Sequence, residues 1–375
     1  MKSYCSKWKL SINADKSRIV VFKKGNQPVN EFWHFGNKIL ETCKKFKYLG
    51  NMLAANGSFY QTQLTLADQA RKAVFLLYRR VNASFRNIKP LFMMDLFDKF
   101  IEPILSYGCE VWGFHPAKDI EKIHLKLCKN VLKVRQNTQD ECVYGELGRM
   151  PLKYRRYIRI VKYWLNIVMG KKSYLVNCCY ISSVRKLELN NKPSWARDVK
   201  QLLCSHGFGE AWYNQGVGNA EAFIHVFKQT LHDIYKQNWS AIVNTSPKCR
   251  FYKEIKPFHQ PSEYLSIVIP KKHRIAMTRF LVSSHSLRVE TGRWTRPVTP
   301  RNDRLCTTCN QMEDEYHFLL ECPLYCEIRK KLIPKFFWQR PSMFKAVQLL
   351  KCNEPKIVKG VAKFIYEAFI VQQTP

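Results

Sequence analysis

Three cysteines and one histidine near the end of the chain form the pattern C-x2-C-x7-H-x4-C: Cys306, Cys309, His317 and Cys322. Three thiolates and one imidazole suit a tetrahedral zinc ion, and four protein ligands leave no open position for a catalytic water. The spacing therefore predicts a structural Zn²⁺ site, a zinc knuckle, and not a hydrolase centre. The alternative is a set of unrelated buried thiols beside a surface histidine, because the chain has 14 cysteines. Cys326 is expected to be a buried thiol on the following helix.

The charge balance is strongly basic, with 62 Lys and Arg against 29 Asp and Glu and a formal net charge of +33 over 375 residues. Self-repulsion of this size is usually tolerated because a polyanion neutralises it, so RNA or DNA is the first expected partner. An anionic membrane surface is the second candidate from charge alone, and no run approaches the roughly 20 apolar residues of a membrane span. A membrane role nevertheless ranks last, because no lipidation signal or amphipathic terminus accompanies the charge. The start of the chain has no signal-peptide core. Scattered cysteines without a disulfide framework favour the cytosol or the nucleus.

The first fifty residues are rich in β-prone runs and tight turns. Arg18–Phe22 predicts a short strand. Glu31–Phe35 and Lys38–Glu41 flank Gly36-Asn37, a pair that accepts positive φ, so these segments predict a hairpin. Phe46–Gly50 predicts one further strand.

Helical periodicity dominates the rest of the chain. It predicts helices over Ser58–Val81, Pro90–Phe100, Asp119–Val134, from Pro151 onward, Ser194–Ser205, Asn219–Val243 and after Pro270. Thr138 and Glu141 have the spacing of a capping box for a short helix that Gly145 or Gly148 would close. The periodicity weakens between residues 171 and 191, which predicts a linker.

Several predicted helices carry basic residues off their apolar faces. Such stripes can follow the phosphates of a nucleic acid, although a solvated helix face has the same pattern. The candidates are Arg71, Lys72 and Arg79; Arg155, Arg159 and Lys162; and Lys271, Lys272 and Arg274. Arg293, Trp294, Arg296 and Arg301 lead directly into the first metal ligand. Trp294 suits base stacking, or alternatively an anchor in the core.

Seven short motifs occur in an order that resembles one protein family. They are Trp8–Phe22 (Trp-Lys-Leu-Ser-Ile-Asn and the following strand), Lys47–Gly50, Ala67–Ala73, Ile104–Gly113, Gly145–Leu152, His273–Ala276 and Glu290–Trp294, followed by the Cys/His cluster. The ordered set resembles the C-terminal part of reverse transcriptases of non-LTR (LINE-like) retrotransposons. The resemblance implies the end of the palm, a thumb domain, a connector and a zinc segment. It also implies that Lys16 matches a lysine near the incoming nucleotide, and that Lys47, Tyr48, Leu49 and Gly50 match the hairpin that holds the primer end.

The catalytic acids of that family have no counterpart in this sequence. Such polymerases transfer nucleotides with two metal ions held by aspartates. The family places its Asp-Asp turn before the Trp-Lys-Leu-Ser motif, which begins here at Trp8, and the sequence contains no Asp-Asp pair. We therefore expect a truncated chain that is inactive by itself as an RNA-directed DNA polymerase, with no bound Mg²⁺. Asp95, Asp98 and the run Glu313-Asp314-Glu315 are interpreted as surface charge.

These observations predict an α+β fold that is mainly helical, with five segments. They are a β palm-end remnant (1–56), a thumb-like helical domain (57–170), a mainly helical connector (171–262), a basic segment with the knuckle (263–335) and a helical tail (336–375). The first functional hypothesis is a binder of RNA or DNA. The alternative is a zinc-stabilised protein-interaction scaffold, which Glu313, Asp314, Glu315 and Glu321 around the knuckle favour. A third possibility is a decayed fragment with an unpaired sheet edge. The sequence does not indicate whether RNA or DNA is preferred, or what the oligomeric state is.

Overall fold

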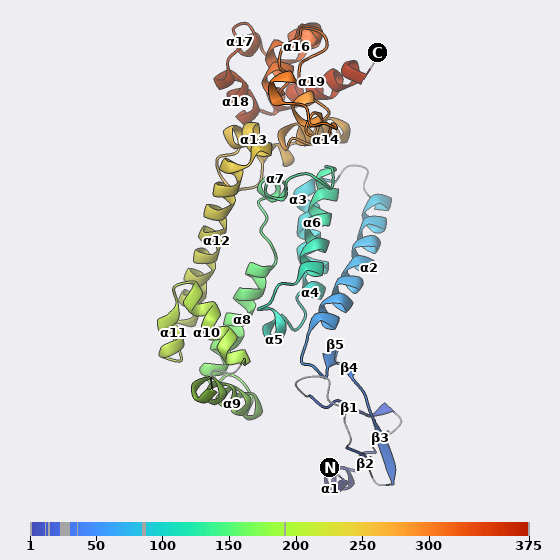
Figure 1. The fold of residues 1–375 in the computed structure, drawn as a ribbon, viewed down its shortest axis with the longest axis vertical. Helices are drawn as coiled ribbons and strands as arrows, with labels where there is room; N and C mark the ends of the chain where they lie inside the picture. Colours follow the sequence, from blue (N-terminus) through green and yellow to red (C-terminus); the bar gives the residue numbers. More distant parts are fainter. Residues whose placement is uncertain are drawn as a thin grey trace.

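The computed structural model describes residues 2–11, 13, 16–22, 31–35, 37–84, 88–190 and 193–373. It is mainly helical with a few short strands, which confirms the predicted fold class. The strands lie at one end of an elongated molecule, beside the N-terminus, and the last helices lie at the other end (Figure 1).

Three strands form the first sheet, β1 (Arg18–Ile19), β2 (Trp33–Phe35) and β3 (Lys38–Thr42). Their order is β1-β3-β2, with β1 parallel and β2 antiparallel to β3. The pairing of Phe35 with Lys38 confirms the predicted hairpin; Gly36 of its turn lies outside the described residues. The first predicted strand is shorter than expected, because only its first two residues pair. The sequence patterns also missed helix α1 (Lys2–Lys7).

A second hairpin joins β4 (Lys45–Tyr48) to β5 (Asn51–Ala54), with Tyr48 opposite Asn51. Its two turn residues, Leu49 and Gly50, both have positive φ, 44° and 87°. That is the backbone of a type I′ turn, which matches the twist of the flanking strands. The Tyr107 hydroxyl donates a hydrogen bond of 2.8 Å to the Leu49 carbonyl and fastens the hairpin to the helical body.

The first helical layer places the predicted apolar faces inside. Its helices are α2 (Tyr60–Ser84), α3 (Pro90–Phe100), α4 (Glu102–Leu105), α5 (Cys109–Trp112), α6 (Lys118–Leu132), α7 (Asp140–Leu147) and α8 (Lys153–Val168). Leu66, Ala70 and Val81 of α2 are buried, and Pro90 occupies the first turn of α3 as predicted. A break before Pro103 separates α3 from α4, because proline tolerates only the first turn of a helix.

The capping box predicted for α7 is wrong. Gln139 is the N-cap and makes no side-chain cap hydrogen bond. The Thr138 hydroxyl bonds instead to Ser284 Oγ, 3.1 Å away and 146 residues distant in sequence, and Glu141 accepts from Gln139. The long-range contact satisfies the hydroxyl that the local pattern assigned to the cap. Gly148, one of the two predicted stops, ends the helix with φ +60°.

Replacement of Gly148 by alanine should destabilise the fold by more than about 1 kcal/mol, because alanine disfavours this positive φ. An added Cβ would also clash with Pro261 Cδ. Gly170→Ala is the matched control, since Gly170 has φ +68° and no atom within 4 Å of the added Cβ. Urea unfolding should show a larger loss for Gly148→Ala. Equal losses would mean that backbone strain alone, without the contact to Pro261, sets the cost.

The predicted linker at residues 171–191 is also wrong, because helix α9 (Tyr174–Asn190) occupies it. Its periodicity is blurred because outward residues such as Tyr174 are apolar too, with 85% of Tyr174 exposed. Inward residues include Tyr180, whose hydroxyl accepts a 3.0 Å hydrogen bond from Trp164 Nε1. Next come α10 (Trp195–Ser205), α11 (Gly209–Tyr213), which the sequence patterns missed, and α12 (Ala220–Thr245). Ser194 and Asn219 cap α10 and α12, and both helices begin where predicted.

The C-terminal third consists of short elements around one long helix. They are η2 (Pro247–Cys249), α13 (Arg250–Ile255), η3 (Glu263–Leu265), α14 (Lys271–Leu281), α15 (Arg288–Thr291), η4 (Arg301–Asp303), η5 (His317–Glu321), η6 (Pro323–Tyr325), α16 (Cys326–Leu332), α17 (Lys335–Trp338), α18 (Met343–Lys351) and α19 (Pro355–Gln373). Buried residues from Leu66 to Ala368 form one contiguous apolar cluster. This core therefore extends across the segment boundaries predicted at residues 171, 263 and 336. The division of the chain into five segments remains a prediction. None of the described helices has the length and apolar character needed to span a membrane.

Candidate metal centre and basic surface

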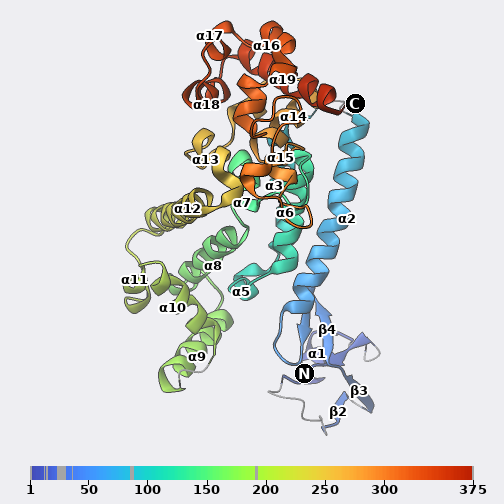
Figure 2. The same cartoon turned by 45° about the horizontal axis from the view of Figure 1, so that its top comes forward.

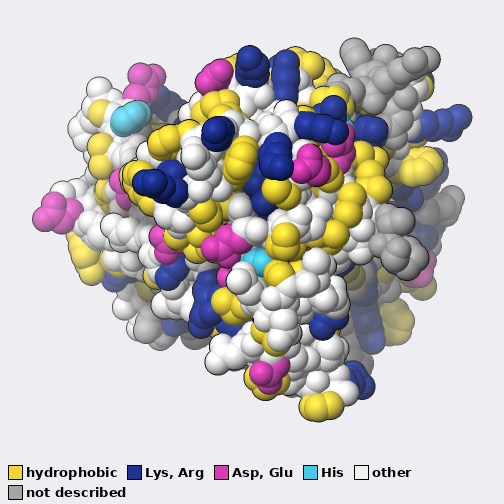
Figure 3. Space-filling view, turned by 90° about the horizontal axis from the view of Figure 1, so that it is seen from above, with side chains coloured by type: hydrophobic (Ala, Val, Ile, Leu, Met, Phe, Trp, Pro, Cys, Tyr) yellow, Lys and Arg dark blue, Asp and Glu magenta, His cyan; other side chains and the backbone are white. Residues whose placement is uncertain are grey.

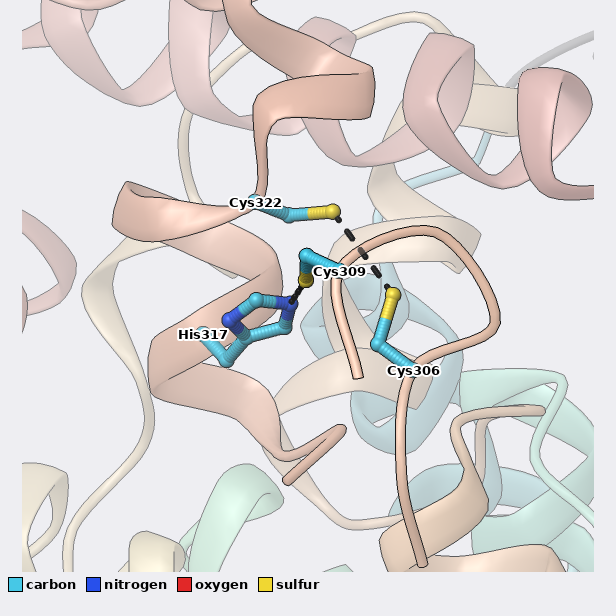
Figure 4. A group of neighbouring side chains, drawn as sticks. All are labelled: Cys306, Cys309, His317 and Cys322. Atoms are coloured by element: carbon cyan, nitrogen blue, oxygen red, sulfur yellow. Dashed lines mark hydrogen bonds between the residues drawn. The ribbon is translucent and has the colours of Figure 1, made fainter. Parts of the chain in front are cut away.

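The four predicted ligands converge on one point. Their ligand atoms all lie within 4.8 Å of one another, with 3.2 Å between Cys309 Sγ and His317 Nε2 and 3.9 Å between the sulfurs of Cys306 and Cys322 (Figure 4). Tetrahedral zinc with Zn–S bonds of about 2.3 Å would separate two sulfurs by about 3.8 Å. The cluster can therefore hold a metal ion, and its donor set and spacing fit zinc.

Two local structures present these ligands. Cys306 and Cys309 lie in a tight turn, in which Cys306 N–H donates to the Gln311 carbonyl (2.7 Å) and Asn310 N–H donates to the Cys306 carbonyl (3.0 Å). His317 and Cys322 lie at the beginning and just past the end of η5, and Cys322 N–H donates to the His317 carbonyl (2.8 Å). Backbone hydrogen bonds therefore hold both arms in the arrangement that brings the four ligand atoms together.

The thiols differ in their acidity. Burial raises the pKa of Cys306, but hydrogen bonds from the Thr308 and Cys309 backbone and from His317 outweigh burial and lower it to about 7. Burial raises the pKa of Cys322 to about 12. Metals bind cysteine as the thiolate, so metal uptake releases protons and its affinity falls as the pH falls.

Glu313 and Glu315 of the knuckle are internal, so their interpretation as surface charge is wrong, whereas Asp314 is half-buried and Glu321 is exposed. Glu313 is 6% exposed and accepts hydrogen bonds of 2.8 Å from Arg288 N–H and from Gln372 Nε2. Glu315 is also buried and lies 3.1 Å from His285 Nε2. These carboxylates connect the metal loop to α15, to α19 and to the turn after α14. They no longer support a protein-binding surface at the knuckle.

A buried arginine that the sequence patterns missed supports the last ligand. Arg329 on α16 is 4% exposed, and its guanidinium donates to the carbonyls of Leu319 (2.9 Å) and Cys322 (3.0 Å). No local pattern marks it, because a helical arginine is normally exposed. Cys326 is partly buried at the start of α16 and lies outside the cluster, in line with the prediction that it is not a ligand.

The arginines predicted on the basic face of α8 have acidic partners within the fold. Arg155 Nη1 lies 2.7 Å from Asp98 Oδ1, and Arg159 Nη2 lies 2.9 Å from Glu102 Oε2. Arg149 also donates to Asp98, at 2.6 Å. Asp98 is therefore not the free surface charge that the sequence suggested. Lys162, the third predicted residue of this face, is exposed.

Two further candidates for nucleic-acid contact also bond within the fold. Arg274 is 6% exposed and donates to the Ile88 carbonyl at 3.1 Å. Arg293 pairs with Glu290 at 2.9 Å and donates to the Pro247 carbonyl. Their guanidinium groups have structural roles, which the basic pattern alone could not reveal.

The remaining candidates reach the surface. They are Lys47, Tyr48, Arg71, Lys72, Arg79, Lys162, Lys271, Lys272, Trp294, Arg296 and Arg301. Trp294 is 53% exposed, with Lys248 Nζ 4.7 Å from its ring centroid, so it is no core anchor. Lys16 is exposed too. Lys and Arg side chains are also spread among hydrophobic and acidic ones over the end of the molecule that carries α16–α19 (Figure 3).

The exposed cations come from both ends of the molecule and from the helices between them. The structure brings the four metal ligands together, and it does not gather the predicted nucleic-acid residues into a single site. Comparison of the chain with protein-family models, with curated proteins and with solved structures finds no match.

Proposed function

We propose that this chain binds RNA or DNA and corresponds to the C-terminal part of a non-LTR reverse transcriptase, without polymerase activity of its own. The observation that supports this most is a stripe on α2 formed by Lys72, Phe75, Leu76 and Arg79 (the α2 stripe). These positions share one face of a helix. Phe75 is 67% exposed and Leu76 55% exposed, between two exposed cations. Cations that contact phosphates beside an exposed ring that stacks on bases suit a single strand.

The metal cluster has a supporting role in this proposal. A Zn²⁺ ion held by Cys306, Cys309, His317 and Cys322 would fix the C-terminal segment and would have no open position for catalysis. Mg²⁺ is not expected, because the sequence has no Asp-Asp pair to hold the two metals of polymerase chemistry. The charge of +33 supplies the long-range attraction to a polyanion.

Binding of single-stranded RNA should weaken steeply with salt, with a log–log slope of about −0.7 for each phosphate contacted. Lys72→Glu/Arg79→Glu should reduce the affinity at least about tenfold and flatten the slope, as measured by fluorescence anisotropy. Arg155 and Arg159 are unsuitable for charge reversal, because it would break their pairs with Asp98 and Glu102.

The matched control is Lys228→Glu/Lys236→Glu on α12, which makes the same change in charge on another long helix. Both lysines are exposed, and Lys236 lies 3.9 Å from Asp233 much as Lys72 lies 3.0 Å from Asp68. Affinity that does not respond to salt would contradict the proposal. Equal losses in the two variants would remove the α2 stripe as the binding surface.

The outward face of α9 favours a second candidate, the protein-interaction scaffold. Tyr174, Leu175 and Leu189 are 85%, 71% and 78% exposed. Exposed apolar side chains along one helix can form a surface that another protein covers. Bound zinc without any RNA or DNA binding would favour this candidate over the first.

A further inference from the structure

A groove of about 410 Å³ lies between α14 and α19, which are side by side in Figures 1 and 2. Each wall of the groove is one face of a helix, because its residues recur at intervals of three or four positions. They are Lys272, Ile275, Ala276 and Arg279 of α14, and Tyr366, Phe369 and Ile370 of α19. Arg135, after α6, and Ser284 to Ser286, after α14, complete this α14–α19 groove. Its volume lies in the range of small-ligand sites.

Among the described residues, no acidic side chain forms an ion pair with the cations of the groove. Arg135, Lys272 and Arg279 are exposed, and no Asp or Glu occurs among the described residues that line the groove. Arg279 Nε donates to the Lys133 carbonyl at 2.7 Å, which leaves the rest of its guanidinium for a ligand. Burial and then the nearby Arg135 lower the pKa of Arg279, so two like charges face one another there. Such a pair is stabilised by an anion.

The polar groups deeper in the groove are already satisfied. His285 lies 3.1 Å from Glu315 through Nε2 and accepts from Leu287 N–H through Nδ1 at 3.3 Å. Ser284 Oγ accepts from Arg135 N–H at 3.0 Å. The groups that remain available to a ligand are therefore the cations at the rim of the groove. Below them lies a wall formed by Ile275, Ala276, Tyr366 and Phe369.

We propose that the α14–α19 groove holds one nucleotide unit of a single strand, with its phosphate on Arg135 and Arg279 and its base against Tyr366 and Phe369. Lys272 lies seven residues from Arg279, about 10 Å along the helix, where it can contact the strand on the other side of the base. Its ammonium lies 4.8 Å from the Tyr366 ring centroid and marks the aromatic end of the groove. An unstacked base exposes the face that such a wall recognises. This inference rests on the proposed nucleic-acid binding and adds a site distinct from the α2 stripe.

The phosphate contact is tested with Arg135→Gln/Arg279→Gln against Arg250→Gln/Lys253→Gln. The second pair lines a different, open groove of about 570 Å³ and removes the same charge. Anisotropy with a single-stranded RNA oligonucleotide should show about a tenfold loss of affinity for the first pair, with a salt slope smaller by about 1.4. The control pair should lose less than about threefold.

The base contact is tested with Tyr366→Leu and with an oligonucleotide of the same length that lacks every base. Wild type should prefer the base-bearing strand by at least about fivefold, and Tyr366→Leu should lose much of that preference. Circular dichroism of each variant verifies its fold. Two results together would overturn the groove as a nucleotide site and leave the proposed function intact. They are an equal loss of affinity in the two double variants and an unchanged base preference in Tyr366→Leu. Absence of salt-sensitive binding in wild type would overturn both.

Discussion

Cys322→Ser should lose bound zinc and unfold the segment around η5 and α16. Cys322 is 0% exposed, and its carbonyl is tied to Arg329, so a failed metal site also disturbs a buried contact. The binding free energy of structural zinc adds directly to folding, and apparent values reach about 10–16 kcal/mol in zinc-finger peptides. Here the surrounding core retains part of the structure, so we expect a loss of several kcal/mol in urea unfolding.

Cys326→Ser is the matched control for that experiment. It makes the same chemical change four residues later, at a thiol outside the cluster. Elemental analysis should find one zinc per chain in wild type and in Cys326→Ser, and none in Cys322→Ser. A metal chelator should reproduce the effect of Cys322→Ser on wild type. Full stability of Cys322→Ser without zinc would mean that the apolar core alone holds this segment.

The metal cluster could be predicted from the sequence because its four ligands lie within 17 consecutive residues. A turn between Cys306 and Cys309 and a short helical turn from His317 to Cys322 suffice to bring them together. The helices of the core were also predictable, because burial of one face imposes a period on the sequence. The starts of two helices could be predicted at Ser194 and Asn219, and the structure shows that these two residues are the N-caps.

Contacts between residues far apart in sequence could not be predicted. Thr138 bonds to Ser284 and not to its own helix, and Asp98 lies 51 residues from Arg149. Glu313 faces inward because Gln372 and the Arg288 backbone reach it. In each case a polar side chain found a partner that only the tertiary fold supplies. The same limit explains why Arg155 and Arg159 suggested a phosphate-binding face.

Asp98→Ala should destabilise the chain by about 3 kcal/mol, because removal of the carboxylate leaves the buried charge of Arg149 unpaired. Arg149 is affected most, since its side chain is only 11% exposed and also lies over Phe97, 5.8 Å from the ring centroid. Asp95→Ala is the matched control. Asp95 is exposed on the same helix three residues earlier, and among the described residues no ion pair involves it. Urea unfolding should show a much larger loss of unfolding free energy for Asp98→Ala than for Asp95→Ala.

The charge of Asp98 should also make stability depend on pH. Burial raises its pKa, but hydrogen bonds from Arg149 and Arg155 outweigh burial and lower it to about 2, from 3.8 in the unfolded chain. A carboxyl group with a lower pKa in the folded state contributes its stabilisation above the unfolded value and loses it as the pH falls toward the folded value. The difference in unfolding free energy between wild type and Asp98→Asn should therefore shrink between about pH 5 and pH 2. A difference that stays constant over this range would mean that the shape of the side chain, and not its charge, holds α3 to α8.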